Sequence, residues 1–409
     1  MLEARARQIF ERYHFGEIRI PVVERTDLFR RSIGETTDIV EKEMYTFDDR
    51  DATSLTLRPE GTASVVRAYV EHALHVAEPV SKLYYMGPMF RRERPQKGRL
   101  RQFSQIGAEV LGRDDAAADA EVLLLLHDLL AGFEIDDAEV QINSLGCHEC
   151  RPPYRQALVA WGREHEEELC ADCKRRIEQN PLRLLDCKQP GCRAIRDTAP
   201  RMVDHYCDDC RRHFEQVRSL LDAEGIRPPL SPYMVRGLDY YCRTAFEIVA
   251  PGLGAQNAIG GGGRYDGLVR DLGGPNVAGV GFALGIERLV LALGDRELPG
   301  AELEFFVAPL GESAETAAIQ IAHRLRGEGA RVEVESGGKS LKSQMRRAGK
   351  LGARFVLILG DDEMSSQEMT IRDMQARRDH KQAVSFRASL TELRAALAAR
   401  TVAVTEKRA

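Results

Sequence analysis

The chain has 409 residues, of which 43% are hydrophobic and 30% charged, and its formal net charge is −5. This length suffices for two or three domains with a sizeable core, and the composition is ordinary for a globular protein. All apolar runs are shorter than the roughly 20 residues that a membrane-spanning helix needs. The first residues predict an amphipathic helix without the continuous apolar stretch of a secretory signal, so we expect a cytoplasmic protein.

The chain divides by sequence pattern into three regions, of which the first is interrupted by the second. Residues 1–146 and 233–300 mix helices with apolar strands such as KLYYMGPMF, AEVQINSL and TAFEIVA. Between them, residues 147–232 are rich in cysteine, arginine and helix formers, which predicts a helical insertion. A polar connector with proline and glycine at 293–302 predicts a domain boundary.

The remaining residues, 301–409, alternate strand and helix patterns. FFVAPL, RVEVE, RFVLILG, QEMTIRD and QAVSF are strand-like, and the stretches 313–327 and LKSQMRRAGKLG are helical. The pattern S-x-x-E from Ser389 is a capping box that opens a last helix. The alternation predicts a small α/β domain with a largely parallel sheet. Residues 303–409 hold 18 Lys and Arg against 14 Asp and Glu, and this mild basic excess favours contact with a polyanion.

The segment TLRPEGT (56–62) precedes a helical run. In it Glu60 lies between Pro59 and Gly61, and Thr62 begins the helical run. A carboxylate and a hydroxyl at a helix entrance can be capping groups, and we would favour that interpretation if the segment stood alone. The alternative is that Glu60 binds the ammonium group of a ligand.

The segment MFRRERPQKGRLRQF (89–103) predicts a hairpin with an arginine-rich loop. A charged run is usually a solvated face, but Arg91 directly follows the apolar Phe90. We therefore expect its guanidinium in a cleft, where arginine binds phosphate or carboxylate in a bidentate manner. On the returning strand Gln105 and Glu109 are four residues apart, which places them on one face.

Two further segments combine glycines with arginine. In AIGGGGRYDGLV (258–269), four consecutive glycines let the backbone approach a ligand closely. The pattern matches neither a P-loop nor a dinucleotide fingerprint, and a flexible loop is less favoured because apolar residues lie on both sides. In GVGFALGIERLVLAL (279–293), small residues lead into a helix with Arg288 near its start. A buried arginine is costly unless it is paired or binds an anion.

Together with RGLDYY (236–241), these segments resemble class II aminoacyl-tRNA synthetases, and in particular the histidyl-tRNA synthetase family. SIGETTDIVEKEMYTF is similar to the family's first, dimer-forming motif, MFRRERPQKGRLRQF to the second and GFALGIERL to the third. RGLDYY and AIGGGGRYDGL are similar to its two histidine signatures. The resemblance covers nearly the whole chain, and five motifs in the correct order are far more specific than any one of them.

The resemblance implies a fold and an activity. The fold is an α+β class II core, an antiparallel sheet flanked by helices, over 1–146 and 233–300, with the helical insertion 147–232 and a C-terminal α/β anticodon-binding domain over 301–409. The activity is ATP-dependent ligation of L-histidine to its tRNA through a histidyl-adenylate, with release of AMP and pyrophosphate. The resemblance further implies a homodimer and Mg²⁺ bound with the ATP.

Two other functions are considered for the same motifs. A non-catalytic, histidine-sensing regulatory paralogue would typically lack the phosphate-binding arginines and the C-terminal domain, and both are present here. A pseudo-synthetase domain that only binds RNA is usually fused to other modules, and the sequence shows none. Family members usually also carry a leading segment that ends in an Arg-Gly-x-x-Asp type motif. This chain begins on the helix that follows that segment, so a truncated sequence is expected, and this bears on the completeness of the dimer.

The resemblance also implies roles for single residues. Arg91 would bind the α-phosphate of ATP and the histidine carboxylate, and Arg99 and Arg288 would hold the outer phosphates. Arg236 would lie near the α-phosphate, where the family uses an arginine in place of a metal, so Arg91 and Arg236 are the expected catalytic residues. The other expected histidine-binding residues are Glu60, Gly61, Thr62, Gln105, Glu109, Tyr240, Tyr241 and Tyr265. The residues expected at the tRNA acceptor end are Gln96 and Lys97.

Eight of the nine cysteines form four close pairs within the predicted insertion. The pairs are Cys147 with Cys150, Cys170 with Cys173, Cys187 with Cys192, and Cys207 with Cys210. Close pairs in a reducing compartment are typical of metal or redox chemistry, and two of them make a Cys₄ zinc site. Redox catalysis is less favoured because nothing else resembles thioredoxin, and eight free thiols are the remaining alternative. We expect one or two structural Zn²⁺ ions, remote from the adenylation site, and assign no role to Cys242.

Overall fold

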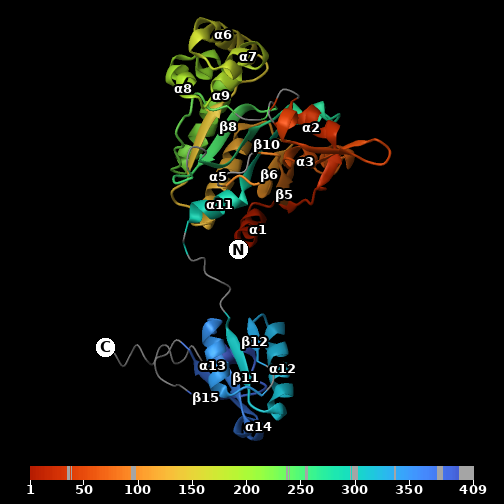
Figure 1. The fold of residues 1–409 in the computed structure, drawn as a ribbon, viewed down its shortest axis with the longest axis vertical. Helices are drawn as coiled ribbons and strands as arrows, with labels where there is room; N and C mark the ends of the chain where they lie inside the picture. Colours follow the sequence, from red (N-terminus) through yellow and green to blue (C-terminus); the bar gives the residue numbers. More distant parts are fainter. Residues whose placement is uncertain are drawn as a thin grey trace, which may run out of the picture. The chain divides into compact units, whose positions relative to one another are not determined.

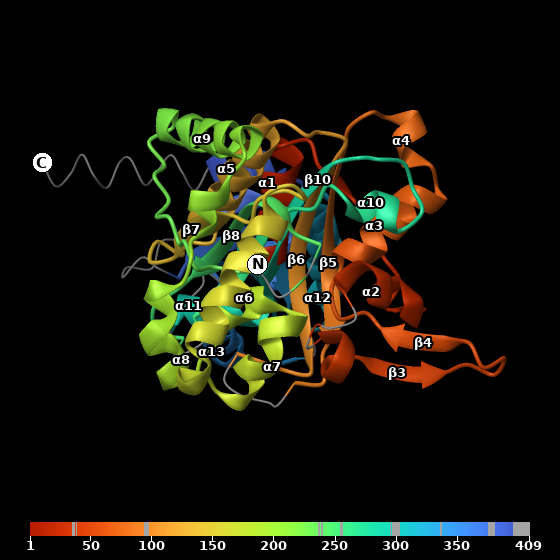
Figure 2. The ribbon, with the colours of Figure 1, turned by 90° about the horizontal axis from the view of Figure 1, so that it is seen from above.

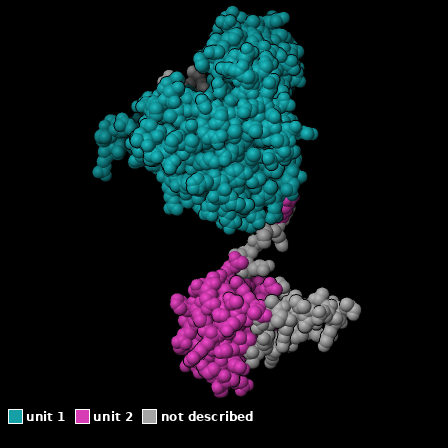
Figure 3. Space-filling view, turned by 180° about the vertical axis from the view of Figure 1, so that it is seen from behind, with its two compact units in different colours: residues 1–295 teal, residues 296–409 magenta. Residues whose placement is uncertain are grey.

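The computed structural model (Figure 1) divides into two compact units, residues 1–295 and residues 296–409, which Figure 3 distinguishes by colour. It describes residues 1–34, 37, 39–93, 98–235, 238, 240–253, 257–294, 296, 303–335, 338–374 and 381–395. The division falls in the predicted polar connector. None of the helices within these described ranges is long and apolar enough to cross a membrane.

A seven-stranded sheet forms the centre of the first unit, in the order β1-β5-β6-β10-β9-β8-β7. The strands are β1 (Gly16–Glu17), β5 (Ser81–Phe90), β6 (Gln102–Leu111), β7 (Glu139–Ser144), β8 (Cys242–Val249), β9 (Ala258–Arg264) and β10 (Gly279–Gly285). The β1–β5 pair is parallel, and the other five pairs are antiparallel. The predicted antiparallel core is therefore confirmed.

Alternation along the strands gives this sheet one apolar face and one face for the site. On β6, Ile106, Ala108 and Val110 are buried in the main hydrophobic core, against α1 (Leu2–Arg12) and α5 (Ala116–Gly132). In this core the ring of Phe10 on α1 stacks on that of Tyr84, with centroids 4.4 Å apart. Because successive side chains of a strand point to opposite faces, the alternate residues Gln105, Gly107 and Glu109 face the other way.

The other face is covered by α3 (Thr62–Glu71) and by a small sheet that leads into it. This sheet has the order β2-β4-β3, with β2 (Val23–Arg25), β3 (Tyr45–Asp48) and β4 (Ser54–Leu57), and both pairs are antiparallel. In Figure 2, β3 and β4 project from the body of the unit as an arm. The remaining elements nearby are α2 (Thr26–Ile33), the π-helix η1 (Ile39–Glu43), α4 (Leu74–Ala77), α10 (Leu268–Asp271) and α11 (Ile286–Leu293).

The glycine run is not a flexible loop, the less favoured alternative, because it forms β9 in the middle of the large sheet. A Cβ on Gly260 would lie 2.5 Å from the carbonyl oxygen of Ala283, and one on Gly262 would lie 2.1 Å from that of Gly281. Glycine is a weak strand former by itself. Here pairing with β8 and β10 outweighs that preference, and the absent side chains permit a closeness that other residues would prevent.

Residues 147–232 form the expected helical insertion, which Figure 1 shows beside β8. Its α-helices are α6 (Arg151–Glu164), α7 (Ala171–Gln179), α8 (Pro190–Ile195) and α9 (Asp208–Ala223). Short 3₁₀ turns connect them, namely η2 (Glu166–Glu168), η3 (Pro181–Leu184), η4 (Arg196–Thr198) and η5 (Met202–His205). The exact limits of the insertion and of the other domains stay a prediction.

The second unit holds a five-stranded sheet in the order β12-β11-β13-β14-β15. Its elements are β11 (Phe305–Pro309), α12 (Glu312–Gly327), β12 (Val332–Val334), α13 (Leu341–Lys350), β13 (Phe355–Leu359), α14 (Asp361–Ser366), β14 (Glu368–Asp373) and β15 (Lys381–Ser385). The predicted capping box is confirmed, since the backbone N–H of Ser389 donates to Glu392 (2.7 Å) and that of Glu392 to the Ser389 hydroxyl (3.2 Å).

The expectation of a largely parallel sheet in this unit is wrong for two of the four strand pairs. Strand β11 runs parallel to β12 and β13, but β13–β14 and β14–β15 are antiparallel. A parallel crossover needs a dozen or more residues. The connection between β13 and β14 is only the short helix α14, which the sequence pattern did not reveal, so β14 turns back along β13.

Candidate active site

A cleft of about 240 Å³ opens on the site face of the large sheet. Eight of the residues expected from the sequence line it, although they come from segments far apart along the chain. They are Glu60, Thr62, Arg91, Arg99, Gln105, Tyr240, Tyr241 and Arg288. The lining also includes residues that the sequence analysis did not single out, such as Tyr85, Glu93, Phe103, Glu247 and Glu287. Glu93, Phe103 and Glu287 lie within the quoted motifs without having been assigned a role, whereas no local pattern marks Tyr85 or Glu247.

Glu60 is both a helix cap and part of the cleft wall. Its carboxylate accepts hydrogen bonds from the backbone N–H groups of Thr62 (2.6 Å) and Ala63 (2.9 Å), in the first turn of α3. Burial raises the pKa of Glu60, and these two hydrogen bonds lower it in part. A carboxylate has about four acceptor positions. Capping and binding of an ammonium group are therefore compatible, and the sequence alternatives do not exclude one another.

Two arginines hold the turn that carries Glu60. The buried guanidinium of Arg58 donates to the carbonyl oxygens of Pro21 (3.1 Å) and Pro88 (2.8 Å), and burial lowers its pKa. On the other side, Nε of Arg91 donates to the carbonyl oxygen of Pro59 (2.9 Å). The turn is thus fixed at two points. The sequence analysis missed Arg58, although its place two residues before Glu60 was a possible signal.

Arg91 itself is oriented toward the cleft by its neighbours. Its guanidinium lies over the ring of Phe103, 5.2 Å from the centroid, while Nε is engaged by Pro59. Phe103 is on β6, opposite Met89 of the same hairpin. Stacking on an aromatic face fixes the plane of the guanidinium, and Arg91 lines the cleft beside Glu60.

Glu109 lies fully buried behind the cleft wall. Oε1 accepts a hydrogen bond from the hydroxyl of Thr62 (2.6 Å), and Oε2 accepts one from the hydroxyl of Tyr265. Burial raises the pKa of Glu109 to about 8, although both hydrogen bonds act to lower it. A Cβ on Gly281 would lie 1.9 Å from Oε2, so only glycine leaves room for this carboxyl group.

Aromatic side chains surround this carboxyl group. The ring centroid of Tyr240 lies 4.7 Å from that of Tyr241 and 5.7 Å from that of Tyr265. The ring of Tyr85 fits between two glycines, because a Cβ on either Gly61 or Gly107 would lie 2.2 Å from it. Gly61 therefore shapes the pocket.

Among the residues that the structure describes, several buried polar atoms of the cleft lining lack a hydrogen-bond partner, and the side-chain oxygen of Gln105 is one of them. Oε1 of Gln105 is buried and makes no hydrogen bond to any residue that the structure describes. Gln105 lines the cleft together with Tyr240 and Tyr241. A buried polar atom without a partner is costly, so it indicates a place for a ligand's hydrogen-bonding group.

The opposite end of the cleft is rich in arginine. Arg99 pairs with Glu93 at 2.5 Å, and the pKa of Arg288 is lowered by burial and by the nearby charge of Arg99. The carboxylate of Glu287 accepts a hydrogen bond from the backbone N–H of Ser104, with both oxygens 2.9 Å from the nitrogen. Two guanidinium groups this close together favour an anion between them.

A buried ion pair behind β9 was also missed by the sequence analysis. Arg264, fully buried, donates from Nε to Oδ1 of Asp119 on α5 (2.9 Å), and Nε2 of His213 on α9 lies 2.8 Å from Oδ2. Burial by itself would raise the pKa of Asp119, but His213 and Arg264 lower it. This network joins the large sheet to the insertion. The feature of the sequence that could have indicated it is the arginine directly after the glycine run.

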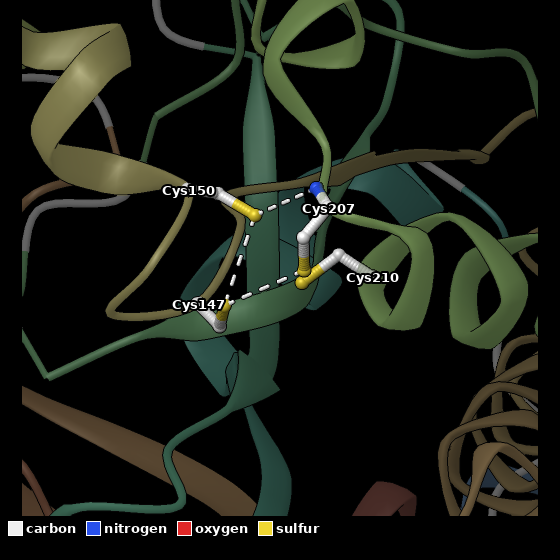
Figure 4. A group of neighbouring side chains, drawn as sticks. All are labelled: Cys147, Cys150, Cys207 and Cys210. Atoms are coloured by element: carbon white, nitrogen blue, oxygen red, sulfur yellow. Dashed lines mark hydrogen bonds between the residues drawn. The ribbon is translucent and has the colours of Figure 1, made fainter.

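The eight paired cysteines gather into two groups of four. The first cluster is Cys147, Cys150, Cys207 and Cys210, and the second cluster is Cys170, Cys173, Cys187 and Cys192. Figure 4 shows the sulfur atoms of the first cluster turned toward one another, two from the loop after β7 and two from the start of α9. The sequence left open how the pairs combine, and the structure joins the first pair with the last.

The spacing of the sulfur atoms fits one tetrahedral metal ion per cluster. The Sγ atom of Cys147 lies 3.7 Å from that of Cys150 and 3.8 Å from that of Cys207, and the Sγ atoms of Cys170 and Cys187 are 3.8 Å apart. Four thiolates at about 2.3 Å from a zinc ion would be about 3.8 Å from one another. All eight thiols are free, so no disulfide competes for this arrangement.

Backbone N–H groups point at the sulfur atoms of these clusters. In the first cluster, the N–H of Cys207 donates to Sγ of Cys150 (3.1 Å). Burial raises the pKa of the Cys147 thiol, but hydrogen bonds from the N–H groups of Cys150 and Glu149 outweigh it and bring the pKa to about 7. These contacts suit thiolates better than neutral thiols.

Three expected site residues, Arg236, Gln96 and Lys97, lie outside the described residues.

Two family profiles together match most of the chain. The profile described as Histidyl-tRNA synthetase matches residues 1–289, and the one described as Anticodon binding domain matches residues 304–399. The Histidine–tRNA ligase of Syntrophotalea carbinolica is 56% identical over 373 residues, which are 91% of this chain and 89% of that protein. The Histidine–tRNA ligase of Geobacter sulfurreducens is 54% identical over 91% of this chain and 90% of its own length.

Solved structures give the same grouping. The apo histidyl-tRNA synthetase of S. aureus is 36% identical and superposes with a TM-score of 0.75, over 94% of this chain and 92% of that one. The histidyl-tRNA synthetase of Nostoc sp. PCC 7120 is 21% identical with a TM-score of 0.70 and supports the fold alone.

Proposed function

The chain belongs to the histidyl-tRNA synthetase family and ligates L-histidine to its tRNA with ATP, and we propose that the cleft binds both small substrates end to end. The observation that carries this proposal is the order of side chains along the cleft, with buried Glu60 and Glu109 beside tyrosines at one end and Arg99 and Arg288, accompanied by Glu93 and Glu287, at the other. The regulatory alternative fails because ligases match over 91% of the chain, including the C-terminal domain.

Histidine occupies the tyrosine-lined end in this proposal. Glu60 receives the ammonium group, since its carboxylate is buried at the cleft wall with acceptor positions to spare. The imidazole lies against Tyr240 and Tyr241, with Glu109 and Tyr265 behind the Thr62 hydroxyl as the polar groups that recognise ring nitrogens. A pocket built to hydrogen-bond both ring nitrogens rejects analogues that lack them by roughly 10⁴-fold or more.

ATP occupies the arginine-rich end. Arg91, between Glu60 and Phe103, binds the α-phosphate and the histidine carboxylate, and Arg99 and Arg288 bind the outer phosphates. Mg²⁺ bound with ATP would neutralise further phosphate charge, and Glu93 and Glu287 offer the oxygen ligands that it prefers. Arg236 beside the α-phosphate, and Gln96 and Lys97 at the tRNA acceptor end, stay predictions from the sequence.

The chemistry then needs little beyond charge and position. The histidine carboxylate oxygen bonds to the α-phosphorus, the bond to the bridging oxygen breaks, and pyrophosphate leaves with its electron pair. A ribose hydroxyl of the tRNA next attacks the carbonyl of the adenylate and AMP leaves. Fixed guanidinium groups stabilise the charge that develops on the phosphate oxygens, and alignment of the reactants supplies much of the remaining acceleration.

We also propose one Zn²⁺ in each cysteine cluster. The support is the sulfur spacing of 3.7–3.8 Å and the convergence of all eight thiols into two groups of four. Zinc would hold together the loops of an insertion with short helices, and thiolate binding contributes directly to folding free energy. Elemental analysis of protein purified without chelator should give two zinc ions per chain. Eight freely titratable thiols and no zinc would contradict the proposal.

A homodimer and a cytoplasmic location complete the proposal. The segment similar to the dimer-forming motif ends in β3, at one edge of the small sheet, where Phe47 is 45% exposed. Burial of this exposed aromatic ring by a second copy would stabilise the dimer. The C-terminal unit would bind the anticodon.

Pyrophosphate exchange dependent on both histidine and ATP tests the proposed cleft. Wild-type protein should exchange, and Arg91→Ala should lower the rate by at least 100-fold, as expected for loss of a charge-stabilising group. A folded Arg91→Ala protein with unchanged exchange would contradict the assignment of this end of the cleft.

A further inference from the structure

The two cysteine clusters differ in what they adjoin. The second cluster draws all four ligands from residues 170–192, inside the insertion. The first cluster draws Cys147 and Cys150 from the loop directly after β7, and β7 pairs with β8, whose preceding residues are Tyr240 and Tyr241. The first cluster is therefore linked through β7 and β8 to the tyrosines of the cleft, whereas the ligands of the second cluster all lie within the insertion. The expectation that the metal ligands are remote from the adenylation site stays a prediction.

The Cys150 side of the first cluster reaches the histidine pocket through Arg151. Cys150 is the N-cap of α6, and Arg151 is the first residue of that helix. Its Nη2 donates to the carbonyl oxygen of Tyr241, and its Nε donates to that of Leu145 (3.3 Å). One guanidinium thus joins the backbone that follows β7 to the backbone that carries a pocket tyrosine.

The Cys207 side of the cluster holds the same strand end. Tyr206 directly precedes Cys207, and its hydroxyl donates to the carbonyl oxygen of Ser144 (3.2 Å). Its ring is buried against Phe214 of α9, with centroids 6.2 Å apart. A side chain next to each half of the first cluster therefore donates a hydrogen bond at the end of β7: Arg151 to the carbonyl oxygen of Leu145, and Tyr206 to that of Ser144.

Backbone pairing extends this contact to the tyrosine segment. The N–H of Leu145 donates to the carbonyl oxygen of Arg243 (2.7 Å), and the N–H of Arg243 donates to that of Gly146 (2.9 Å). Arg243 has a φ of 47°, in the left-handed region, and the β8–β9 register shifts beside it. A non-glycine residue keeps such a conformation only where its surroundings impose it.

We propose that the first cluster and Arg151 form a clasp that positions Tyr240 and Tyr241, so that metal in this cluster controls histidine affinity. The clasp rests on the proposed histidine pocket. A metal ion that joins Cys147 and Cys150 to Cys207 and Cys210 fixes both side chains that hold the end of β7. Metal in the second cluster stabilises the insertion but leaves this strand end in place.

The decisive experiment compares two double variants that each remove two thiols. Cys147→Ser with Cys207→Ser disrupts the first cluster, and Cys170→Ser with Cys187→Ser disrupts the second. Each should lose one zinc ion per chain. The first should raise the Kd of histidine in calorimetry, and its KM in pyrophosphate exchange, by roughly tenfold or more, with the KM of ATP within about twofold of wild type. The second should leave the histidine Kd unchanged. Equal effects of the two variants on histidine affinity would overturn the clasp.

A second pair of variants tests the clasp without touching a thiol. Arg151→Ala removes the bonds to Tyr241 and Leu145, and should raise the histidine KM roughly tenfold, the effect of losing one charge-assisted hydrogen bond. Arg155→Ala is the matched control, because Arg155 lies on the same helix but donates to Glu178 (3.0 Å) and Gln179 (3.1 Å) of α7. Arg151→Lys should recover part of the loss.

These outcomes separate the clasp from the proposed pocket. Wild-type protein that fails to exchange pyrophosphate with histidine would reject the pocket itself. If the wild-type protein exchanges pyrophosphate with histidine and Arg151→Ala has an unchanged histidine KM, the clasp is rejected but the proposed pocket is not.

Discussion

Glu109 should make histidine affinity depend on pH between about 6 and 9. Its pKa is about 8 because the carboxyl group is fully buried, so it is mostly protonated at neutral pH before histidine binds. Free imidazole has a pKa of about 6.5. If the bound pair shares one proton, binding near pH 7 needs no net proton exchange. Above pH 8 the complex must take up a proton, and below pH 6.5 it must release one.

The magnitude follows from the linkage between protons and ligand. Each pH unit beyond either limit should weaken histidine binding by up to tenfold, or about 1.4 kcal/mol. Glu109→Gln removes the titrating group, so the loss above pH 8 should be smaller in this variant. At pH 7.5 its histidine affinity should already be roughly 10–100-fold lower, because a hydrogen bond to a charged group is replaced by a neutral one.

Calorimetric titration of histidine between pH 6 and 9, in the absence of ATP, measures both quantities. The α-amino group of histidine also titrates at high pH, but it does so equally for the two proteins, so the comparison uses the difference between their profiles. Repeating pH 8.5 in buffers of different ionisation enthalpy counts the proton taken up. Parallel profiles for wild type and Glu109→Gln would refute the shared-proton reasoning.

Other predictions follow from neighbouring features. Glu109→Gln should stabilise the ligand-free protein at pH 8. In the wild type the folded state holds a proton on Glu109 that the unfolded chain releases above its ordinary pKa of 4.5, so the free energy of unfolding falls as pH rises from 4.5 to 8. A thermal melt of the variant showing no gain at pH 8 would contradict this. Arg236→Ala should lower the exchange rate far more than histidine affinity, and unchanged exchange in a folded variant would reject its role. Removing residues 303–409 should spare pyrophosphate exchange and severely weaken tRNA charging, because the first unit holds the cleft; equal loss of both would contradict this division. Asp119→Asn should cost up to about 3–5 kcal/mol in urea unfolding, since it removes the fully buried ion-pair partner of Arg264 and leaves only the partly exposed Asp266.

The sequence was sufficient to predict those elements and residues whose pattern depends on neighbours along the chain. Alternation in residues 303–395 located the strands and helices of the second unit, and the capping box at Ser389 formed as predicted. The arginine and tyrosine motifs, through their resemblance to the synthetase family, identified eight residues of the cleft lining. In each case the informative residues are close together along the chain.

The rest could not be predicted because it depends on partners that are distant in sequence. Glycines 260–263 form a central strand only because β8 and β10 pair with them on either side. Which cysteine pairs combine depends on the loop after β7 meeting the start of α9, some 60 residues later. The bond from Arg151 to Tyr241 spans 90 residues and has no local pattern at all.

The order of charges along the cleft explains how one site can orient two substrates without a separate device for each. Glu60 and Glu109 lie at the end that would hold the ammonium and imidazole groups, and Arg99 and Arg288 lie at the end that would hold the outer phosphates. Arg91, between them, is fixed by Pro59 and Phe103 where carboxylate and α-phosphate would meet. A histidyl-adenylate placed the other way round would set phosphate oxygens against the carboxylate of Glu60 and an ammonium group against arginines. Both contacts are repulsive in a poorly solvated cleft, where charge interactions are stronger than in water. The same charges that stabilise the reaction therefore also impose the substrate orientation.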